Sequence, residues 1–361
     1  MHPIRTTAIH TALLLLLSVL SNGCANTPKA APTSDTLAAA PAAVVVAPVA
    51  SAQRNYASHP QAAQFIADMA ARHQLPPAEV TALLADAKPQ QSILDAMSRP
   101  AEAKPWRDYR PIFLTRERIN GGVAFWNTNA QILADAQQHF GVDSRVVVAI
   151  VGVETRYGGN TGKYRVLDAL ATLGFDYPKR GEFFRGELEQ FLLLTREEHV
   201  DARTAKGSYA GAMGQGQFIP SSYRAYAVDF DGDGKRDLWN SERDVLGSVA
   251  NYFKEHGWQQ GAPVVARAQV RGTAYKALLD KGLKPHMPAS DLAKYGVHTE
   301  SPIAPNTPVA LVELDGADGL EQWVVFNNFY VITRYNRSPL YAMAVHQLSN
   351  EIAATRASAQ R

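Results

Sequence analysis

The chain has 361 residues, enough for two or three domains with sizeable cores. Its 36 Lys and Arg residues nearly balance its 34 Asp and Glu residues and no long run of one sign appears, so the composition argues against nucleic acid as a partner. Cys24 is the single cysteine, which excludes an internal disulfide.

Residues 1–23 predict an export signal. Arg5 precedes an apolar run formed by residues 13–17 with Val19 and Leu20, which is too short to span a bilayer comfortably, and small or polar residues follow it. We expect residues 1–23 to be a lipoprotein signal peptide.

The residues around Cys24 are similar to the lipobox of bacterial lipoproteins, in which the cysteine becomes the acylated first residue. Ser21 stands where that pattern usually has Leu, and Leu20 lies one position further back. By the same resemblance, Ala25 rather than Asp favours the outer membrane, so the expected location is the periplasm, with a lipid anchor on Cys24. The alternative is a signal peptide that is removed whole, with Cys24 in it.

Residues 24–58 are mostly Ala, Pro and Val with few charges, which predicts a tether. Residues 59–124 have helical periodicity and are expected to form a helical flanking domain. Within it, Trp106, Tyr109 and Pro111 predict a turn-rich crossing.

A helix is predicted from Asp143 to Arg156, with Asp143 as N-cap and Gly158 and Gly159 as the stop. Glu154 falls in its last turn, after the apolar run VVVAIVGV. The unpaired carbonyls of that turn and the apolar neighbours both disfavour an ionised carboxylate. A carboxyl group kept protonated near neutral pH is what a glycosidase needs as general acid, although such a Glu can also simply face solvent.

The segment GSYAGAMGQGQFIPSSY, residues 207–223, is the second candidate for chemistry. Its glycines allow close approach of backbone to a ligand, and Ser208, Gln215 and Gln217 offer groups that suit sugar hydroxyls and acetamides. Phosphate binding is disfavoured because Gly-Lys-Ser/Thr is absent. A tight loop between helices is the structural alternative.

The segment DFDGDGKRDLWNSERD has the acidic spacing of an EF-hand loop. Its first five ligands would be Asp229, Asp231, Asp233, the Lys235 backbone carbonyl and Asp237. Asn240 replaces the bidentate Glu at position 12, so the standard loop is incomplete there. The carboxylates repel one another unless a cation relieves them, which predicts a structural Ca²⁺ site; an Asp-Gly turn is the alternative.

The residue pattern changes at residues 263–326. The segments VVARAQVRG, PVALVELDG and EQWVVF predict short strands, and SDLAKYG predicts a helix among them, which together indicate a small α+β domain. Helices return over residues 327–361, with Ser338 as N-cap and Pro339 at the first position of the last helix.

Four segments in order, ETRYGG, GAMGQGQFIPSSY, DFDGDGKRDLW and NFYVITRYNRSPLYAMAV, resemble the membrane-bound lytic murein transglycosylase B family. The likeness extends from about residue 59 to the last helix. It implies a mainly α fold, in which residues 125–262 form a lysozyme-like catalytic core with an EF-hand-like loop, and residues 327–361 complete the cleft. The implied reaction cleaves the β-1,4 bond between N-acetylmuramic acid and N-acetylglucosamine in peptidoglycan, leaving a 1,6-anhydromuramyl product.

The resemblance also implies roles for individual residues. Glu154 would be the single catalytic acid and then base, Ser208 would lie near it, and Asp244 would close a longer metal loop. Aromatic and polar groups would bind the glycan, and a basic pair would face murein carboxylates. These substrate-binding residues are Tyr109, Gln217, Tyr252, Tyr335, Asn336 and Tyr341, with Lys179 and Arg180 as the basic pair.

The expected partners are peptidoglycan glycan strands, the outer membrane through the lipid anchor and other cell-wall enzymes, and the expected state is a monomer with no catalytic cofactor. Two alternatives stay open at this point: a hydrolytic muramidase and a non-catalytic peptidoglycan-binding lipoprotein. A calcium-responsive module is disfavoured because a single EF-like loop has no paired partner.

Overall fold

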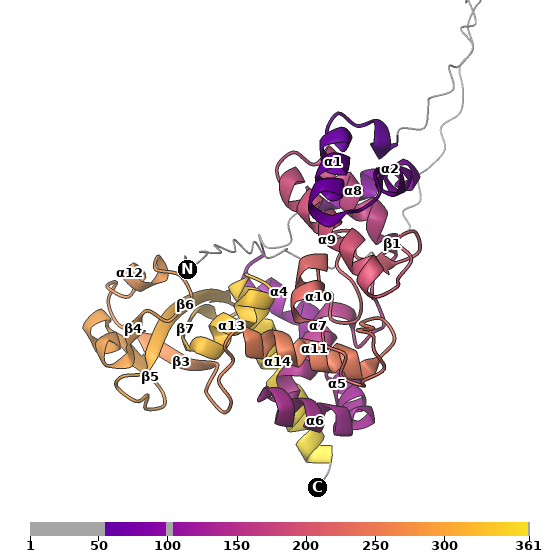
Figure 1. Cartoon of the computed structure of the whole chain (residues 1–361). Coiled ribbons are helices and arrows are strands. Elements are labelled where there is room, and N and C mark those ends of the chain that lie inside the picture. Colours follow the sequence, from indigo (N-terminus) through magenta and orange to yellow (C-terminus); the bar gives the residue numbers. More distant parts are fainter. Residues whose placement is uncertain (1–54, 99–103, 360–361) are drawn as a thin grey trace, which may run out of the picture.

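The computed structural model describes residues 55–98 and 104–359 (Figure 1). Cys24, the signal peptide and most of the expected tether lie outside the described residues. Within the described part, no helix combines the length and the apolar character that crossing a membrane requires.

The described chain is mainly helical, as predicted. In chain order the helices are η1 (Tyr56–Ser58), α1 (Ala62–His73), α2 (Pro77–Asp86), α3 (Gln91–Met97), α4 (Trp106–Phe113), α5 (Arg116–Thr128), α6 (Ala130–Phe140), α7 (Ser144–Thr155), α8 (Val166–Asp176), α9 (Gly181–Glu197), α10 (Pro220–Tyr226), α11 (Glu242–Glu255), α12 (Lys276–Leu279), η3 (Ala289–Tyr295), α13 (Asn327–Tyr335) and α14 (Pro339–Ala359). The strands are β1 (Tyr164–Arg165), β2 (Lys206–Gly207), β3 (Val265–Val270), β4 (Met287–Pro288), β5 (Val297–Thr299), β6 (Pro308–Gly316) and β7 (Gly319–Val325).

The first helices pack at one end of the molecule, where α1 and α2 lie beside α8 and α9 (Figure 1). Arg72 of α1 forms a bidentate ion pair with Glu189 of α9, with N–O distances of 2.7 and 2.8 Å. Tyr56, which the sequence analysis assigned to the tether, is 2% exposed and donates to Asp176 at 2.7 Å. The packed chain therefore begins a few residues before the predicted start at residue 59.

Helix α7 lies at the centre of the helical body, and each of its residues except Arg145 is buried. It packs against α5, α6, α11 and α14. Asp143 is the N-cap as predicted, accepting from the Arg145 backbone N–H at 3.2 Å. The predicted stop at Gly158 and Gly159 comes too late: the helix ends at Thr155, because Arg156 already adopts a left-handed φ of 54°.

Residues 106–113 form helix α4 rather than the predicted turn-rich crossing. Trp106, Tyr109 and Phe113 fall on one face at helical spacing, and all three are buried. This face packs towards α14 and β6. Pro111 is tolerated in the last turn because burial of that face stabilises the helix against the lost hydrogen bond.

The small sheet has strand order β4-β6-β7-β3-β5, and every neighbouring pair is antiparallel. Side chains of β6 alternate between two cores: Val309 and Leu311 pack in the sheet's own core, whereas Ala310 and Val312 join the core of the helical body. Because both faces of β6 are buried, its sequence is a nearly continuous apolar run.

The predicted strands at residues 263–326 are confirmed as β3, β6 and β7, but SDLAKYG forms the 3-10 helix η3 rather than an α-helix. Seven residues between Pro288 and the left-handed Gly296 are too few to establish the cooperative α-helical ladder. The prediction at the C-terminus is confirmed: Pro339 begins α14, and the Ser338 hydroxyl accepts from the Tyr341 backbone N–H at 3.4 Å.

Candidate functional site

Glu154 lies in the last turn of α7 with only 5% of its surface exposed. The Tyr341 hydroxyl, from the first turn of α14, donates to its Oε1 at 2.5 Å. Burial raises the pKa of the Glu154 carboxyl to about 7, although the Tyr341 hydrogen bond acts in the opposite direction. The side chain is therefore protonated in a large fraction of molecules at neutral pH and can donate a proton.

A cluster of tyrosines surrounds this carboxyl group. Tyr335, at the end of α13, donates to the Gly216 carbonyl at 2.6 Å, and Tyr252 of α11 donates to the Arg334 carbonyl at 2.5 Å. The rings of Tyr252 and Tyr335 meet edge to face with centroids 4.8 Å apart. Burial raises the pKa of Tyr335 and of Tyr341 well above 10, and the charge of Glu154 adds to this, so both hydroxyls remain neutral.

Tyr109 of α4 is buried, and it interacts electrostatically with Tyr341. Its ring stacks on Trp106 with centroids 6.4 Å apart and contacts Phe113 at 5.1 Å. The structure thus gathers Tyr109, Tyr335 and Tyr341 near Glu154 from three helices.

The glycine-rich loop of residues 207–219 is anchored beside Glu154. The Thr155 hydroxyl donates to the Gln215 carbonyl at 2.9 Å, which ties the loop to the residue after the glutamate. Ser208 Oγ accepts from the backbone N–H groups of Ala210 and Ala212 at 3.3 and 3.0 Å, so its own proton is available for another acceptor.

Gln217 and Asn336 use part of their polar capacity to hold the backbone. Gln217, in a left-handed conformation with φ 52°, donates to the carbonyls of Thr161 at 3.1 Å and Gly214 at 2.9 Å. Asn336 Oδ1 accepts from the Ser338 backbone N–H at 3.0 Å, just before α14. The side-chain oxygen of Gln217 and the side-chain amide nitrogen of Asn336 take no part in these hydrogen bonds.

The predicted basic pair lies between α8 and α9. Lys179 is exposed, while the Arg180 guanidinium lies over the rings of Phe183 and Phe184, at 4.3 and 5.3 Å from their centroids. Among the described residues, no hydrogen bond or ion pair joins either side chain to Glu154. Burial lowers the pKa of Arg180, Tyr177 opposes this, and the charge of Arg337 acts in the same direction as burial, which relates Arg180 electrostatically to the segment around Asn336.

Two residues that the sequence analysis missed hold the end of α7. The buried Arg118 of α5 donates to the Gly152 carbonyl at 2.8 Å, and the Tyr157 hydroxyl donates to the Arg118 carbonyl at 2.7 Å. Tyr157 has a left-handed φ of 61°, and its ring fills the space over Gly152. Gly122 lies one helical turn after Arg118, and a Cβ at Gly122 would also lie 2.6 Å from the Tyr157 hydroxyl oxygen. The spacing of Arg118 and Gly122 is therefore the sequence signal for this arrangement.

The acidic loop before α11 gathers three carboxylates. Oxygens of Asp229, Asp231 and Asp244 lie within 4.8 Å of one another. Burial raises the pKa of Asp244, with the charge of Asp231 adding to this, and both oxygens of Asp244 accept backbone N–H groups of the loop. Hard oxygen ligands at this spacing fit a calcium ion.

The remaining predicted metal ligands are engaged locally. Asp233 accepts from the Lys235 backbone N–H at 2.9 Å, and Asp237 accepts from the backbone N–H groups of Trp239 and Asn240 at 2.9 and 3.0 Å. The structure therefore brings Asp229, Asp231 and Asp244 together and leaves Asp233 and Asp237 outside that group.

The fold is that of a transglycosylase: the family described as "Transglycosylase SLT domain" matches residues 57–350. The chain is 42% identical to membrane-bound lytic murein transglycosylase B of Escherichia coli (strain K12) over 358 residues, which cover 95% of this chain and 97% of that protein. The chain belongs to the membrane-bound lytic murein transglycosylase B family and is a lytic transglycosylase of peptidoglycan.

Solved structures agree with this assignment. Lytic transglycosylase SltB1 of Pseudomonas aeruginosa is 50% identical, with a TM-score of 0.80, over 84% of this chain and all of that one. The structure of Escherichia coli Slt35 in complex with calcium is 45% identical, with a TM-score of 0.77, over 84% and 95% of the two chains. Pseudomonas aeruginosa SltB3 in complex with NAG-anhNAM-pentapeptide is 33% identical, with a TM-score of 0.72, over 80% and 78%.

Proposed function

We propose that Glu154 is the single catalytic carboxyl group of this lytic transglycosylase, acting as acid and then as base. The observation that carries the proposal is its burial, with a pKa raised to about 7 and one hydrogen bond from Tyr341. A general acid works best when its pKa lies near the operating pH.

In the first step, the Glu154 O–H donates its proton to the oxygen that bridges N-acetylmuramic acid and N-acetylglucosamine, and the bond from C1 to that oxygen breaks. The substrate's own acetamide stabilises the positive charge at C1. In the second step, the Glu154 carboxylate takes the proton of the C6 hydroxyl while O6 bonds to C1. No water is added, and the muramyl product carries a 1,6-anhydro ring, like the ligand of the related SltB3 complex.

The surrounding residues hold the carboxyl group and the sugars. Tyr341 orients Glu154, and the unused proton of Ser208 is directed to the carboxyl group or to the acetamide. Tyr109, Gln217, Tyr252, Tyr335 and Asn336 form the glycan-binding surface, with Lys179 and Arg180 facing substrate carboxylates further out. The hydrogen bond from Tyr335 to the Gly216 carbonyl supports this arrangement, because it joins the tyrosine cluster to the glycine-rich loop.

A calcium ion is proposed for the acidic loop, held by Asp229, Asp231 and Asp244. Asp233, Asp237 and the Lys235 carbonyl would complete the set, and Asp233 and Asp237 would have to exchange their present bonds to nearby N–H groups for the ion. The related Slt35, crystallised with calcium, supports this. The ion would neutralise the crowded carboxylates and stabilise the loop.

The matching protein of Escherichia coli is described as membrane-bound. For this chain we propose a lipid anchor on Cys24 in the periplasmic leaflet of the outer membrane, with peptidoglycan glycan strands as the substrate. Contacts with other cell-wall enzymes and a monomeric state are part of the same proposal.

The test is digestion of purified murein by the wild type and by Glu154→Gln, followed by mass analysis of the products. We expect wild-type products one water lighter than those of a hydrolase, and a loss of rate of about 10³-fold in the variant. Glu351→Gln, at an exposed position of α14, is the matched control and should retain the wild-type rate. Ordinary reducing ends would identify a hydrolytic muramidase, and an active Glu154→Gln variant would show that another group is the acid.

A further inference from the structure

Thr155, the residue after Glu154, is fully buried. Its hydroxyl donates to the Gln215 backbone carbonyl at 2.9 Å, and the Val151 carbonyl, one turn earlier in α7, lies at 3.2 Å. The same oxygen accepts from the Gly158 backbone N–H at 3.0 Å. A threonine that served only its own helix would bond the Val151 carbonyl alone. The contacts with Gln215 and Gly158 therefore join the end of α7 to segments outside the helix.

Gln215 holds the other end of this hydrogen bond, which we call the Thr155–Gln215 bridge, and it is 6% exposed. Its backbone N–H donates to the Leu238 carbonyl at 2.9 Å, and its side-chain Nε2 donates at 2.8 Å to Glu242 Oε1, at the first residue of α11. Its side-chain oxygen packs against Gly158, where an added Cβ would lie 3.0 Å from it. One residue thus connects the end of α7, the acidic loop and the start of α11.

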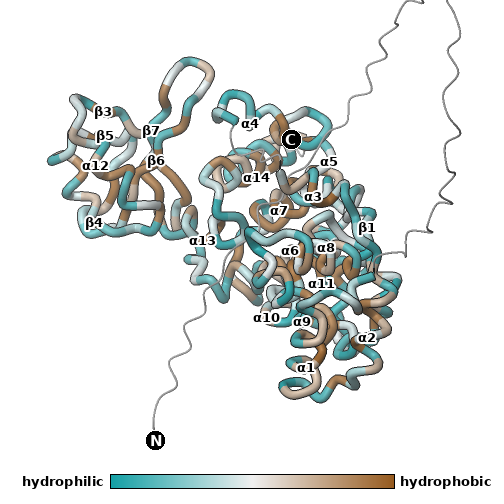
Figure 2. The backbone as a smooth tube through the Cα atoms, turned by 90° about the horizontal axis from the view of Figure 1, so that it is seen from above, coloured by the Kyte–Doolittle hydropathy of each residue, from teal (hydrophilic) through white to brown (hydrophobic). Residues whose placement is uncertain are grey.

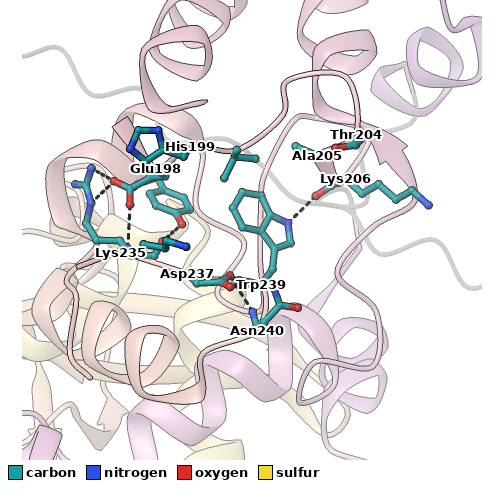
Figure 3. A pocket seen from close by; sticks show the side chains of 12 residues that line it. Glu198, His199, Thr204, Ala205, Lys206, Lys235, Asp237, Trp239 and Asn240 are labelled. Carbon is teal, nitrogen blue, oxygen red and sulfur yellow. Dashed lines mark hydrogen bonds and ion pairs between the residues drawn. The ribbon is translucent and has the colours of Figure 1, made fainter. Parts of the chain in front are cut away.

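The Leu238 carbonyl is a well-held partner for Gln215. Leu238 is 1% exposed, and its backbone N–H donates to the Tyr223 hydroxyl at 3.3 Å. The next residue, Trp239, donates its indole N–H to the Lys206 carbonyl at 2.9 Å, in the pocket of about 450 Å³ that Figure 3 shows. Because its own N–H and the neighbouring side chain are both bonded, this carbonyl has little freedom to move.

The position of Glu154 relative to the glycine-rich loop matters for the proposed reaction. In that reaction Glu154 gives the proton, whereas Ser208 and Gln217 of the loop contact the sugar. Proton transfer requires heavy atoms within about 2.6–3.2 Å, and a displacement of about 1 Å can cost a hundredfold in rate. The Thr155–Gln215 bridge joins the residue next to the acid to the part of the loop between these two sugar contacts.

We propose that Thr155 and Gln215 are positioning residues of the transglycosylase reaction, and that their bridge sets the distance from Glu154 to the sugar held by the loop. This rests on the proposed function, because it takes Glu154 as the acid. Neither residue carries the transferred proton, and both act through Glu154 and the loop. Tyr341 bonds the Glu154 carboxyl group, so the bridge affects geometry rather than protonation.

The test is steady-state kinetics of the full chain on soluble glycan. Thr155→Val keeps a similar shape and removes the hydroxyl, so kcat should fall about tenfold while KM stays within about twofold. Thr155→Ser restores the hydroxyl and should recover kcat to within about twofold of the wild type. The matched control is Thr195→Val, since Thr195 is a buried threonine in the last turn of α9 whose hydroxyl donates to the Leu192 carbonyl of its own helix at 3.0 Å. It should keep the wild-type kcat.

A second variant, Gln215→Met, removes the amide that bonds Glu242 and should lower kcat about threefold. In the Thr155→Val background it should cause no further loss, because both changes act through one bridge. Losses that multiply in the double variant would overturn the proposal.

The pH at which the rate falls should be the same in Thr155→Val as in the wild type, and a shifted profile would show an effect on protonation instead of position. A Thr155→Val variant that loses stability but keeps kcat would show a purely structural role and overturn the proposal, as would a loss that Thr155→Ser does not recover. An active Glu154→Gln variant counts against the proposed function, whereas a fully active Thr155→Val variant counts against the bridge alone.

Discussion

Glu154 and Tyr341 lie 187 positions apart in the sequence and meet at 2.5 Å. Desolvation raises the pKa of the carboxyl group, and the tyrosine hydroxyl limits that rise because it donates to the charged form. Together the two effects place the pKa of Glu154 close to neutral pH, where the carboxyl group can both donate a proton and regain one.

We expect Tyr341→Phe to move the pH profile of cleavage. The first step needs protonated Glu154, so the wild-type rate should fall as the pH rises through about 7. Loss of the hydroxyl raises the pKa of Glu154, so this fall should occur at higher pH, and lost orientation should reduce kcat about tenfold.

Steady-state rates on soluble glycan between pH 4 and 9 check this expectation. Tyr295→Phe, in the small sheet domain, should leave the profile in place. If the cleavage rate of Tyr341→Phe falls at the same pH as that of the wild type, or at a lower pH, Tyr341 does not set the protonation of Glu154.

At the scale of elements, the end of α7 depends on α5 and on the residues that follow Glu154. Arg118 binds the Gly152 carbonyl, and Tyr157 covers Gly152 while donating to the Arg118 carbonyl. This packing leaves no room for a side chain at Gly152, because a Cβ there would lie 2.6 Å from the Tyr157 hydroxyl and Cζ atoms.

Gly152→Ala should therefore displace Tyr157, destabilise the fold by about 1–3 kcal/mol and lower the cleavage rate. Denaturant unfolding and kcat are the measurements. Gly186→Ala in α9 is the matched control: nothing lies within 4 Å of its Cβ, so the helix should gain about 0.5–1 kcal/mol. Equal stability changes in the two variants would show that the contact with Tyr157 is not restrictive.

The acidic loop is a second element with its own expected behaviour. With calcium at about one hundred times Kd, binding to the folded state alone stabilises by about 2.7 kcal/mol. Calcium should raise the Tm of the wild type by roughly 5 °C and chelator should reverse it, whereas Asp231→Ala should show little response. Asp280→Ala, at an exposed position outside the loop, should respond as the wild type does; a calcium response retained in Asp231→Ala would place the ion elsewhere.

At the scale of the whole molecule, α14 joins parts of the chain that are distant in sequence. It packs against α4, α5, α7 and α13, and Figure 2 shows hydrophobic stretches of α7 and α14 within the helical body and others on β6 in the sheet domain. The last helix therefore completes both the main core and the surroundings of Glu154.

Removal of residues 339–361 should abolish the cooperative unfolding transition, because it exposes the apolar surface of α7 and deletes Tyr341. Calorimetry of the truncated chain checks this. Removal of only residues 357–361, which begin at an exposed position, should leave the Tm within about 1 °C of the wild type. A cooperative transition in the chain that lacks residues 339–361 would show that the core forms without α14.

The sequence by itself determined the family, the mainly helical fold, helix α7 with Glu154 in its last turn, and the strands β3, β6 and β7, because caps, periodicity and short motifs act over a few residues. Tertiary structure alone decided that Tyr341 contacts Glu154, that Asp237 lies outside the group of Asp229, Asp231 and Asp244, and that residues 106–113 are helical. Those outcomes depend on burial against elements that lie tens to hundreds of positions away, and local propensity carries no information about such contacts.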